Sequence, residues 1–215
     1  MNKTLVAFAS KQEFNTLFPQ ISAVVAASTP VSVGALYDVT VCGVGVLDFS
    51  VNLASQLSKH RYERVIMLGI CGAYEGRDIQ VGEVVRVDTE VVGDMGVQNA
   101  EGHFIPWGEL IGEPVIYKGD SPRLLPLRLA SVRSVVGVTV NTCTGTRYLS
   151  LRRSGMFNAD VETMEGAACF AVCKKFGASV FQFRAVSNIA TDRDTSAWKI
   201  PEALAALKER VLDNL

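Results

Sequence analysis

The sequence contains few of the residues from which metal and redox sites are built. Only two histidines, His60 and His103, occur in 215 residues, and none of the five cysteines forms a Cys-x-x-Cys pair. Zinc sites need clustered histidine, cysteine or carboxylate ligands, so we expect no metal. An odd number of unpatterned cysteines instead indicates reduced, mostly buried thiols, as in a protein of the cytoplasm.

Long apolar runs and an excess of one charge are also absent. The first apolar run, Leu5 to Ala9, is too short for a signal peptide, and no later run approaches the roughly 20 residues of a membrane helix. The formal net charge is -1 and the basic residues are dispersed, so the sequence shows no cluster of basic residues that would bind nucleic acid or an anionic membrane. We therefore expect a small-molecule ligand and neither of those partners.

With 48% hydrophobic residues, the chain can bury a sizeable core. Apolar runs predict strands at 4–9, 35–44, 64–68, 81–87, 89–92, 134–140 and 178–186. Helical periodicity predicts helices at 10–18, 49–60, 124–132, 144–153, 164–176 and 201–215. Residues 22–33 are rich in Val and Ala, and the Gly- and Pro-rich stretch 93–122 predicts a long binding loop or lid. Because strands and helices alternate without repeat or linker, we predict one α/β domain over residues 1–215.

The segment 160–188 places polar residues at the ends of a predicted helix and a predicted strand. Glu165 stands at the head of an apolar helix that ends at Gly177, and Asn188 follows the next strand. Ligands of open α/β sheets gather at the carboxyl ends of strands, so Asn188 and Glu165 are candidates for one site. The pair Gly43-x-Gly45 also follows a strand, but its third glycine is missing. A tight turn is therefore favoured over a dinucleotide site.

Two motifs in that segment carry a family resemblance. The pattern V-E-x-M-E-G-A-A at 161–168, followed by R-A-V-S-N at 184–188, resembles the nucleoside phosphorylase and nucleosidase superfamily, and within it the futalosine hydrolase branch. The resemblance runs from Leu5 to the C-terminal helix. It implies a central twisted mixed β-sheet flanked by helices, a nucleoside substrate, no cofactor and a homo-oligomer, a dimer or larger.

The same resemblance assigns roles to individual residues. Glu165 would bind the ribose hydroxyls with Met164 beside the sugar, and Glu13 would orient the attacking water. The turn at Ile70, Cys71 and Gly72 would bring backbone amides against the ribose. Two alternatives remain from the residues alone: Glu165, like Glu162, as a carboxylate favoured by a helix N-terminus, and Glu13 as a solvated helix residue.

The nucleophile can be argued from charge. A phosphorolytic site must hold a dianion and needs Arg and hydroxyl donors. In phosphorylase relatives an Arg ends the strand before the glycine turn, and a Ser or Thr follows the first glycine. Met67 and Ile70 occupy those places here. Apolar side chains would leave a phosphate unpaired, so water is favoured.

Asn188 indicates which purine base the site accepts. Adenine-specific nucleosidases of the superfamily have Asp there, which can pass a proton to N7. An Asn cannot protonate the base, but its NH2 can donate to N7 or to a 6-oxo group. This favours hypoxanthine or guanine; the alternative is an Asn that caps a turn.

Other parts of the ligand are less determined by the sequence. Thr142 and Cys143 fall where adenine nucleosidases place a stacking aromatic residue, and Phe104, Trp107 or Tyr148 are candidates to replace it. The resemblance implies an aromatic keto-acid extension at the 5' position. Arg193, Lys199 and Arg77 are the candidates for its carboxylate, and residues 191–198 predict a loop over the site.

We thus expect hydrolysis of the N-glycosidic bond of futalosine, with release of hypoxanthine, in menaquinone biosynthesis. The enzymatic alternative is a 5'-methylthioadenosine/S-adenosylhomocysteine nucleosidase, which Asn188 disfavours. The non-enzymatic alternative is a nucleoside-binding sensor, which has no need of a water-orienting carboxylate. The apolar residues Phe104, Ile105 and Trp107 are candidates for a subunit interface or a lid.

Overall fold

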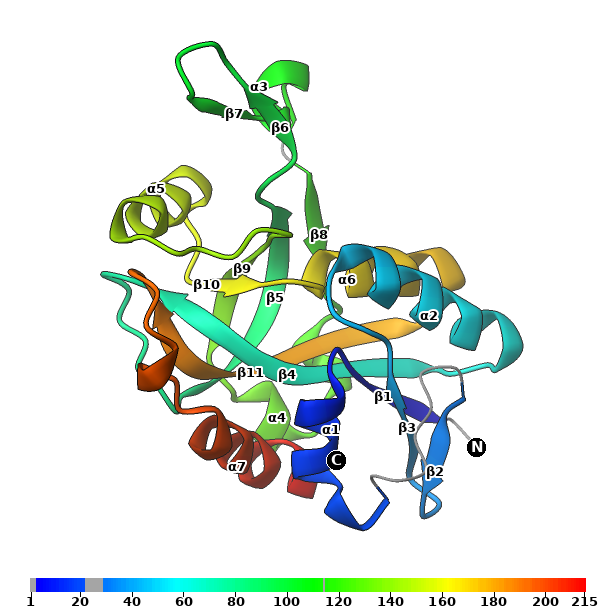
Figure 1. Cartoon of the computed structure of the whole chain (residues 1–215). Helices are drawn as coiled ribbons and strands as arrows, with labels where there is room; N and C mark the ends of the chain where they lie inside the picture. The colour runs from blue at the N-terminus through cyan, green and yellow to red at the C-terminus, as the bar shows by residue number, and fades with distance from the viewer. Residues whose placement is uncertain (1–2, 22–28, 114) are drawn as a thin grey trace.

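The chain folds into a mixed β-sheet with helices on both faces (Figure 1). The structure is a computed structural model and describes residues 3–21, 29–113 and 115–215. Most of the Val- and Ala-rich stretch, at 22–28, lies outside the described residues. None of the described helices is long and apolar enough to cross a membrane.

The elements alternate along the chain. The strands are β1 (Thr4–Phe8), β2 (Val31–Val33), β3 (Tyr37–Val41), β4 (Arg64–Tyr74), β5 (Val84–Val92), β6 (Gly96–Gln98), β7 (Phe104–Pro106), β8 (Ile116–Lys118), β9 (Ser134–Thr139), β10 (Val161–Thr163) and β11 (Ser179–Ala190). The α-helices are α1 (Lys11–Leu17), α2 (Val46–Lys59), α3 (Trp107–Ile111), α4 (Leu127–Ala130), α5 (Arg147–Phe157), α6 (Gly166–Phe176) and α7 (Ile200–Arg210). Short 3-10 turns lie at Pro19–Ile21, Pro122–Leu124, Thr195–Ala197 and Leu212–Asn214.

Within the described ranges, nine strands form one sheet in the order β10-β9-β5-β11-β4-β1-β3-β2, with β8 added to β5. Strands β3, β1, β4 and β11 run parallel to one another, whereas β5 is antiparallel to β11 and β10 is antiparallel to β4. Because β10 pairs with both β9 and β4, the strands from β10 to β4 close on themselves. The expected mixed sheet is confirmed.

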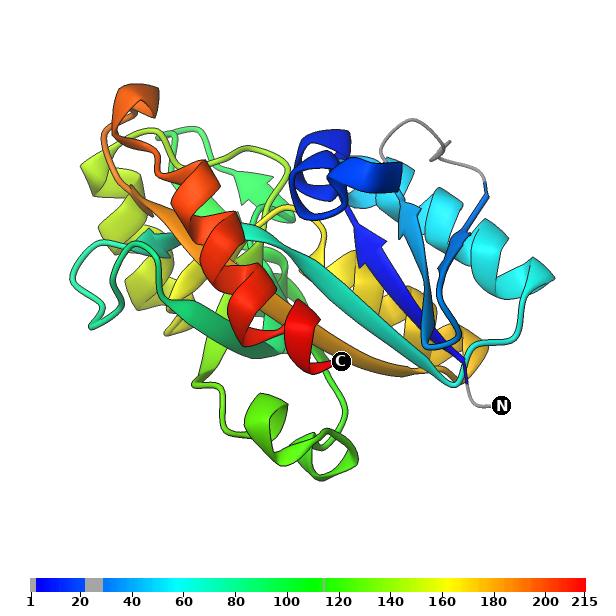
Figure 2. The ribbon, with the colours of Figure 1, turned by 90° about the horizontal axis from the view of Figure 1, so that it is seen from below.

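Strand β1 shows why helices cover both faces. Its side chains alternate, so Val6 and Phe8 enter the core under α1 and α7, while Leu5 and Ala7 enter the core under α2 and α6. Figure 2 shows α7 lying across the first of these faces. Buried on both faces, the strand reads as a continuous apolar run.

Two predicted segments differ in the structure. Residues 93–122 are not a structureless loop: β6 and β7 form a hairpin, α3 follows, and β8 returns to pair with β5. This arm, residues 94–113, projects from the sheet in Figure 1. The turn predicted at Gly69–Gly72 is wrong as well, because β4 continues through both glycines to Tyr74. The glycines there provide room beside the strand.

Candidate active site

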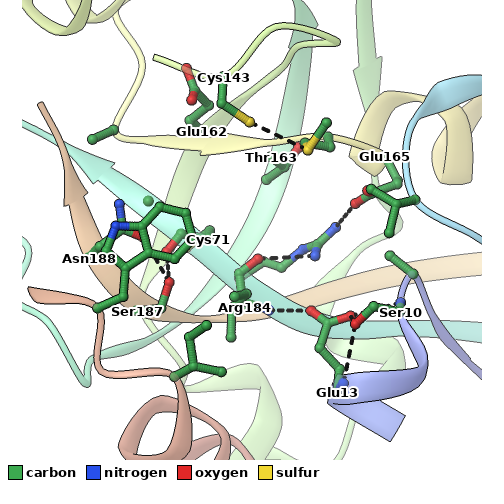
Figure 3. Close-up of a pocket in the computed structure, with 18 of the residues that line it drawn as sticks. Ser10, Glu13, Cys71, Cys143, Glu162, Thr163, Glu165, Arg184, Ser187 and Asn188 are labelled. Atoms are coloured by element: carbon green, nitrogen blue, oxygen red, sulfur yellow. Dashed lines mark hydrogen bonds and ion pairs between the residues drawn. The ribbon is translucent and has the colours of Figure 1, made fainter. Parts of the chain in front are cut away.

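A cavity of about 220 Å³ opens where β1, β4 and β11 reach their carboxyl ends. It is lined by the predicted residues Glu13, Ile70, Cys71, Gly72, Cys143, Met164, Glu165 and Asn188, and by Glu162, Arg184, Ser187, Arg193 and Trp198. Figure 3 shows Glu13 of α1 and the side chains of Arg184 and Asn188 of β11 converging on this cavity. Parallel neighbours end at one edge of the sheet, which brings residues far apart in sequence to one place.

Glu13 is held at the start of α1. Ser10 and Glu13 form a capping box: Ser10 Oγ accepts from the Glu13 amide at 3.2 Å, and the Ser10 amide donates to Glu13 Oε2 at 3.0 Å. Glu13 Oε1 accepts from the Ile70 amide at 2.9 Å. The side chain is buried, so the alternative of a solvated helix residue is wrong.

Gly69 leaves space for two charged groups. A Cβ atom there would lie 2.5 Å from Glu13 Oε1 and 2.6 Å from Arg184 Nη1. Gly72 likewise leaves room for Asn188, whose Nδ2 would lie 3.3 Å from such an atom. Gly69 and Gly72 thus contribute by leaving space for neighbouring side chains, and Ile70 contributes a backbone amide from within the strand. No turn is involved.

Arg184 is the functional residue that the sequence analysis did not assign. Its side chain is 2% exposed, and its Nη2 lies 3.3 Å from Glu165 Oε2. Its Nη1 donates to the carbonyl oxygen of Ile70 at 3.1 Å. Burial alone would lower the pKa of Arg184, but the surrounding groups, with Glu165 and Glu13 foremost, raise it above its ordinary value. A charged residue inside the apolar strand 178–186 was the available signal, because a buried cation requires partners.

Glu165 caps α6 by position but not by its side chain, which turns into the cavity. Its Oε1 accepts from the amide of Gly45, the N-cap of α2, at 3.0 Å. Burial raises the pKa of Glu165, against the lowering effects of Arg184 and the Gly45 amide. The Gly43–Gly45 turn, which has φ of 102° and 85° at its glycines, therefore positions a carboxylate ligand.

Asn188 lies within β11, which runs on to Ala190 instead of ending at Val186. The register against β4 shifts between Val186 and Asn188, so this is a β-bulge that redirects the side chains. Ser187 Oγ donates to Asn188 Oδ1 at 2.8 Å. Asn188 Nδ2 donates to the carbonyl oxygen of Ile189 at 3.1 Å. With the amide oxygen and one N–H engaged, the second N–H of Asn188 remains to donate to a ligand.

Glu162 belongs to β10 and not to a helix, so the helix-terminus alternative is wrong for it. Its carboxylate pairs with Arg153 Nη1 at 2.9 Å. It also accepts from the Thr144 amide at 2.7 Å and from the hydroxyl of Tyr74 at 3.1 Å. This buried network fixes the loop that carries Cys143, whose Sγ lies 3.4 Å from Met164 Sδ.

Some predicted residues do not reach the cavity. Thr142 is exposed, with its amide bound to Asp94, and does not line the cavity. Phe104 lies in β7 of the arm, against Gly96. Trp107 and Tyr148 are also absent from its walls. The aromatic residue that does line it is Trp198, under the guanidinium of Arg193, 5.4 Å from the ring centroid.

Of the three basic candidates, Arg193 alone lines the cavity. Arg77 is bound to Ser154 and Asn158. Within the described ranges, no group of three His, Cys, Asp or Glu residues could hold a metal ion.

Comparisons with known proteins show the family of the chain. The family model described as Phosphorylase superfamily matches residues 5–213. The chain belongs to this superfamily. The futalosine hydrolase of Thermus thermophilus is 30% identical over 181 residues, covering 79% of this chain and 76% of the relative. That of Streptomyces coelicolor is 31% identical over 182 residues, covering 81% and 77%.

These two relatives place the chain in the futalosine hydrolase family of the superfamily. A mutant futalosine hydrolase of Helicobacter pylori has the same fold: its structure matches with a TM-score of 0.76 at 17% identity and covers 100% of both chains.

Proposed function

We propose that this protein hydrolyses the N-glycosidic bond of futalosine, releasing hypoxanthine and dehypoxanthine futalosine in the futalosine route to menaquinone. The observation that carries this proposal is that Glu13, Glu165 and the Asn188 amide face one cavity. The identity to two curated futalosine hydrolases supports the choice of substrate.

In this proposal Glu165 accepts hydrogen bonds from the ribose, and Glu13 orients water at the anomeric carbon. Glu13 accepts three hydrogen bonds from Ser10 and Ile70, which leaves acceptor capacity for a water molecule. The transition state resembles an oxocarbenium ion, so two nearby carboxylates stabilise it electrostatically. The Asn188 NH2 donates to N7 or O6 of the leaving base.

Water rather than phosphate is the proposed nucleophile. The guanidinium of Arg184 is already engaged by Glu165 and by the carbonyl oxygen of Ile70. A phosphate dianion at the sugar end of the cavity, between Glu13 and Glu165, would therefore meet two carboxylates and a cation that is already paired with Glu165. This extends the argument from Met67 and Ile70.

We assign the 5' extension to Arg193 and Trp198. Arg193 is exposed, lies over an aromatic ring and makes no ion pair with a described carboxylate. An Arg193→Met variant should raise KM for futalosine about tenfold to a hundredfold, the value of a charge-assisted hydrogen bond, and leave that for inosine unchanged. Lys199→Met is the matched control. Equal KM changes for both nucleosides would refute the assignment.

A second copy of the chain is the partner we propose. Val44, at the cavity wall, is 53% exposed, and Leu47 and Val51 on α2 are 80% and 68% exposed. An apolar surface next to the cavity is typical of a subunit contact. Light scattering should give a multiple of the 23.2 kDa chain mass; a monomer would contradict this.

The decisive experiment is chromatography of free base released from futalosine, inosine and methylthioadenosine, each with and without phosphate. Hypoxanthine from futalosine, independent of phosphate, is expected. Adenine from methylthioadenosine would refute the role of Asn188, and dependence on phosphate would refute water as nucleophile. Tight binding of futalosine without release would identify a sensor.

A further inference from the structure

Glu90 is a fully buried carboxylate that the mechanism above does not use. It lies on β5, with 0% of its surface exposed. Its Oε2 accepts from the hydroxyl of Thr139, and its Oε1 accepts from the hydroxyl of Thr163 and from Gln182 Nε2, each at 2.9 Å. These donors belong to β9, β10 and β11. One carboxylate therefore joins β5 to three other strands.

This network reaches the first turn of α6. The first amides of a helix have no partner within it, and the N-cap side chain usually accepts from one of them. Glu165 is the N-cap of α6 but makes no such bond. Thr139 Oγ1 accepts from the Ala167 amide instead, at 2.8 Å. Because Thr139 gives its hydroxyl proton to Glu90, its oxygen presents a lone pair to that amide.

Glu90 also contacts the residues that flank the ribose-binding pair. Thr163, which it binds directly, precedes Met164. Gly166 follows Glu165, and a Cβ atom on Gly166 would collide with Glu90 Oε1 and lie 2.6 Å from Gln182 Oε1. Glu90 thus contacts the residue before Met164 and the residue after Glu165, and so fixes the backbone on both sides of this pair.

We propose that Glu90 is a positioning residue for the ribose-binding carboxylate: with Thr139 it supplies the cap of α6, and so leaves the side chain of Glu165 free to enter the cavity. The cap of α6 does not depend on the proposed function, whereas the expected effect on turnover rests on that function. A negative charge is also favourable beside the N-terminus of a helix.

The pKa of Glu90 is raised to about 6, because the effect of burial exceeds the lowering effect of the bonds from Gln182, Thr139 and Thr163. The carboxylate is therefore ionised at neutral pH, in the state that accepts all three hydrogen bonds.

The test compares Thr139→Val, which removes the hydroxyl at constant shape, with Thr139→Ser, which retains it. The control is Thr40→Val, a buried strand threonine outside the network and the cavity. Amide hydrogen exchange of the whole chain should show Ala167 losing protection about fivefold or more in Thr139→Val, the value of an N-cap, and keeping it in Thr139→Ser and Thr40→Val. Unchanged protection at Ala167 would overturn the cap.

Turnover supplies the second readout. If Glu90 and Thr139 act through Glu165, kcat/KM of Thr139→Val should fall about fivefold more for futalosine than for its 2'-deoxy analogue, which lacks one of the hydroxyls that Glu165 binds. Glu90→Gln presents one acceptor oxygen to three donors and should give the same pattern. Equal losses with both nucleosides would overturn the positioning role. If the wild type releases no base, the proposed function fails, and the exchange at Ala167 still decides the cap.

Discussion

A single methyl group at Gly69 should disable the site while leaving the fold in place. Gly69 lies inside β4, and its missing side chain is what allows Glu13 and Arg184 to approach the strand and each other. In Gly69→Ala, the new Cβ atom would lie 2.5 Å from Glu13 Oε1 and 2.6 Å from Arg184 Nη1. Ordinary van der Waals contacts begin near 3.4 Å. Both charged groups must therefore shift by about 1 Å.

The size of the effect follows from that shift. Misplacing a reacting group by about 1 Å costs about a hundredfold in rate. Overpacking of a buried site costs about 1–3 kcal/mol of stability, which is well below the stability of a typical domain of about 5–15 kcal/mol. The variant should thus fold, bind the purine through Asn188, and lose about a hundredfold in kcat for futalosine.

The assay is base release together with chemical denaturation, and Gly155→Ala is the control. Gly155 lies in α5 with open space around its Cβ position and an unremarkable backbone conformation, so alanine there should stabilise the helix by about 0.5–1 kcal/mol. Its kcat should not change. If Gly69→Ala retains wild-type kcat, the placement of Glu13 and Arg184 against β4 does not govern the reaction.

Three further perturbations test other contacts. Asn188→Asp should lower the preference for futalosine over methylthioadenosine at least about tenfold in kcat/KM, because Asp can accept from a 6-amino group; an unchanged ratio would contradict the donor role. Arg153→Met leaves Glu162 buried without its cation and should cost about 3–5 kcal/mol in denaturant unfolding, whereas the double variant with Glu162→Gln should recover most of it. Because the pKa of Glu90 is about 6 when folded, against an ordinary 4.5, the folded state holds a proton that the unfolded state releases between these values. The free energy of unfolding should therefore fall by about 2 kcal/mol as pH rises through this window, and Glu90→Gln should remove that slope; identical slopes would refute it.

Local pattern was sufficient for much of the fold and part of the site. The helix at 164–176 and its end at Gly177 follow from periodicity and from a left-handed glycine, which has φ of 70°. Strand ends in a parallel sheet meet at one edge, so Glu13, Glu165 and Asn188 could be expected together. The structure does bring all three to one cavity.

Contacts between distant segments could not be read from pattern. The glycines at 69 and 72 resembled a turn, because sequence alone does not show which neighbour needs the missing side chain. Trp198 and Arg193 reach the cavity on the loop predicted at 191–198, but the sequence did not show that Trp198 would enter the cavity or that Phe104 would lie on the arm, away from it. Arg184 and Glu90 are charged residues within apolar strands. Their partners come from other strands, so a sequence pattern shows that they need partners but not which ones.

The charges around Arg184 explain why this cavity should favour water over phosphate as the nucleophile. Glu165, Glu13 and Glu90 all raise the pKa of this buried cation, and Glu13 in turn raises the pKa of Glu165. Carboxylates thus outnumber cations at the sugar end of the cavity, which stabilises a developing positive charge on ribose and repels a dianion.

A cation introduced in place of Met67 would not reverse this balance. Arg184 Nη2 lies 3.4 Å from Met67 Sδ, so Met67→Arg would set two guanidinium groups against each other and displace Arg184 from Glu165. Phosphorolysis at this position would first require the loss of a carboxylate. The apolar residue at 67 and the carboxylate pair around Arg184 are therefore two parts of the same preference for hydrolysis.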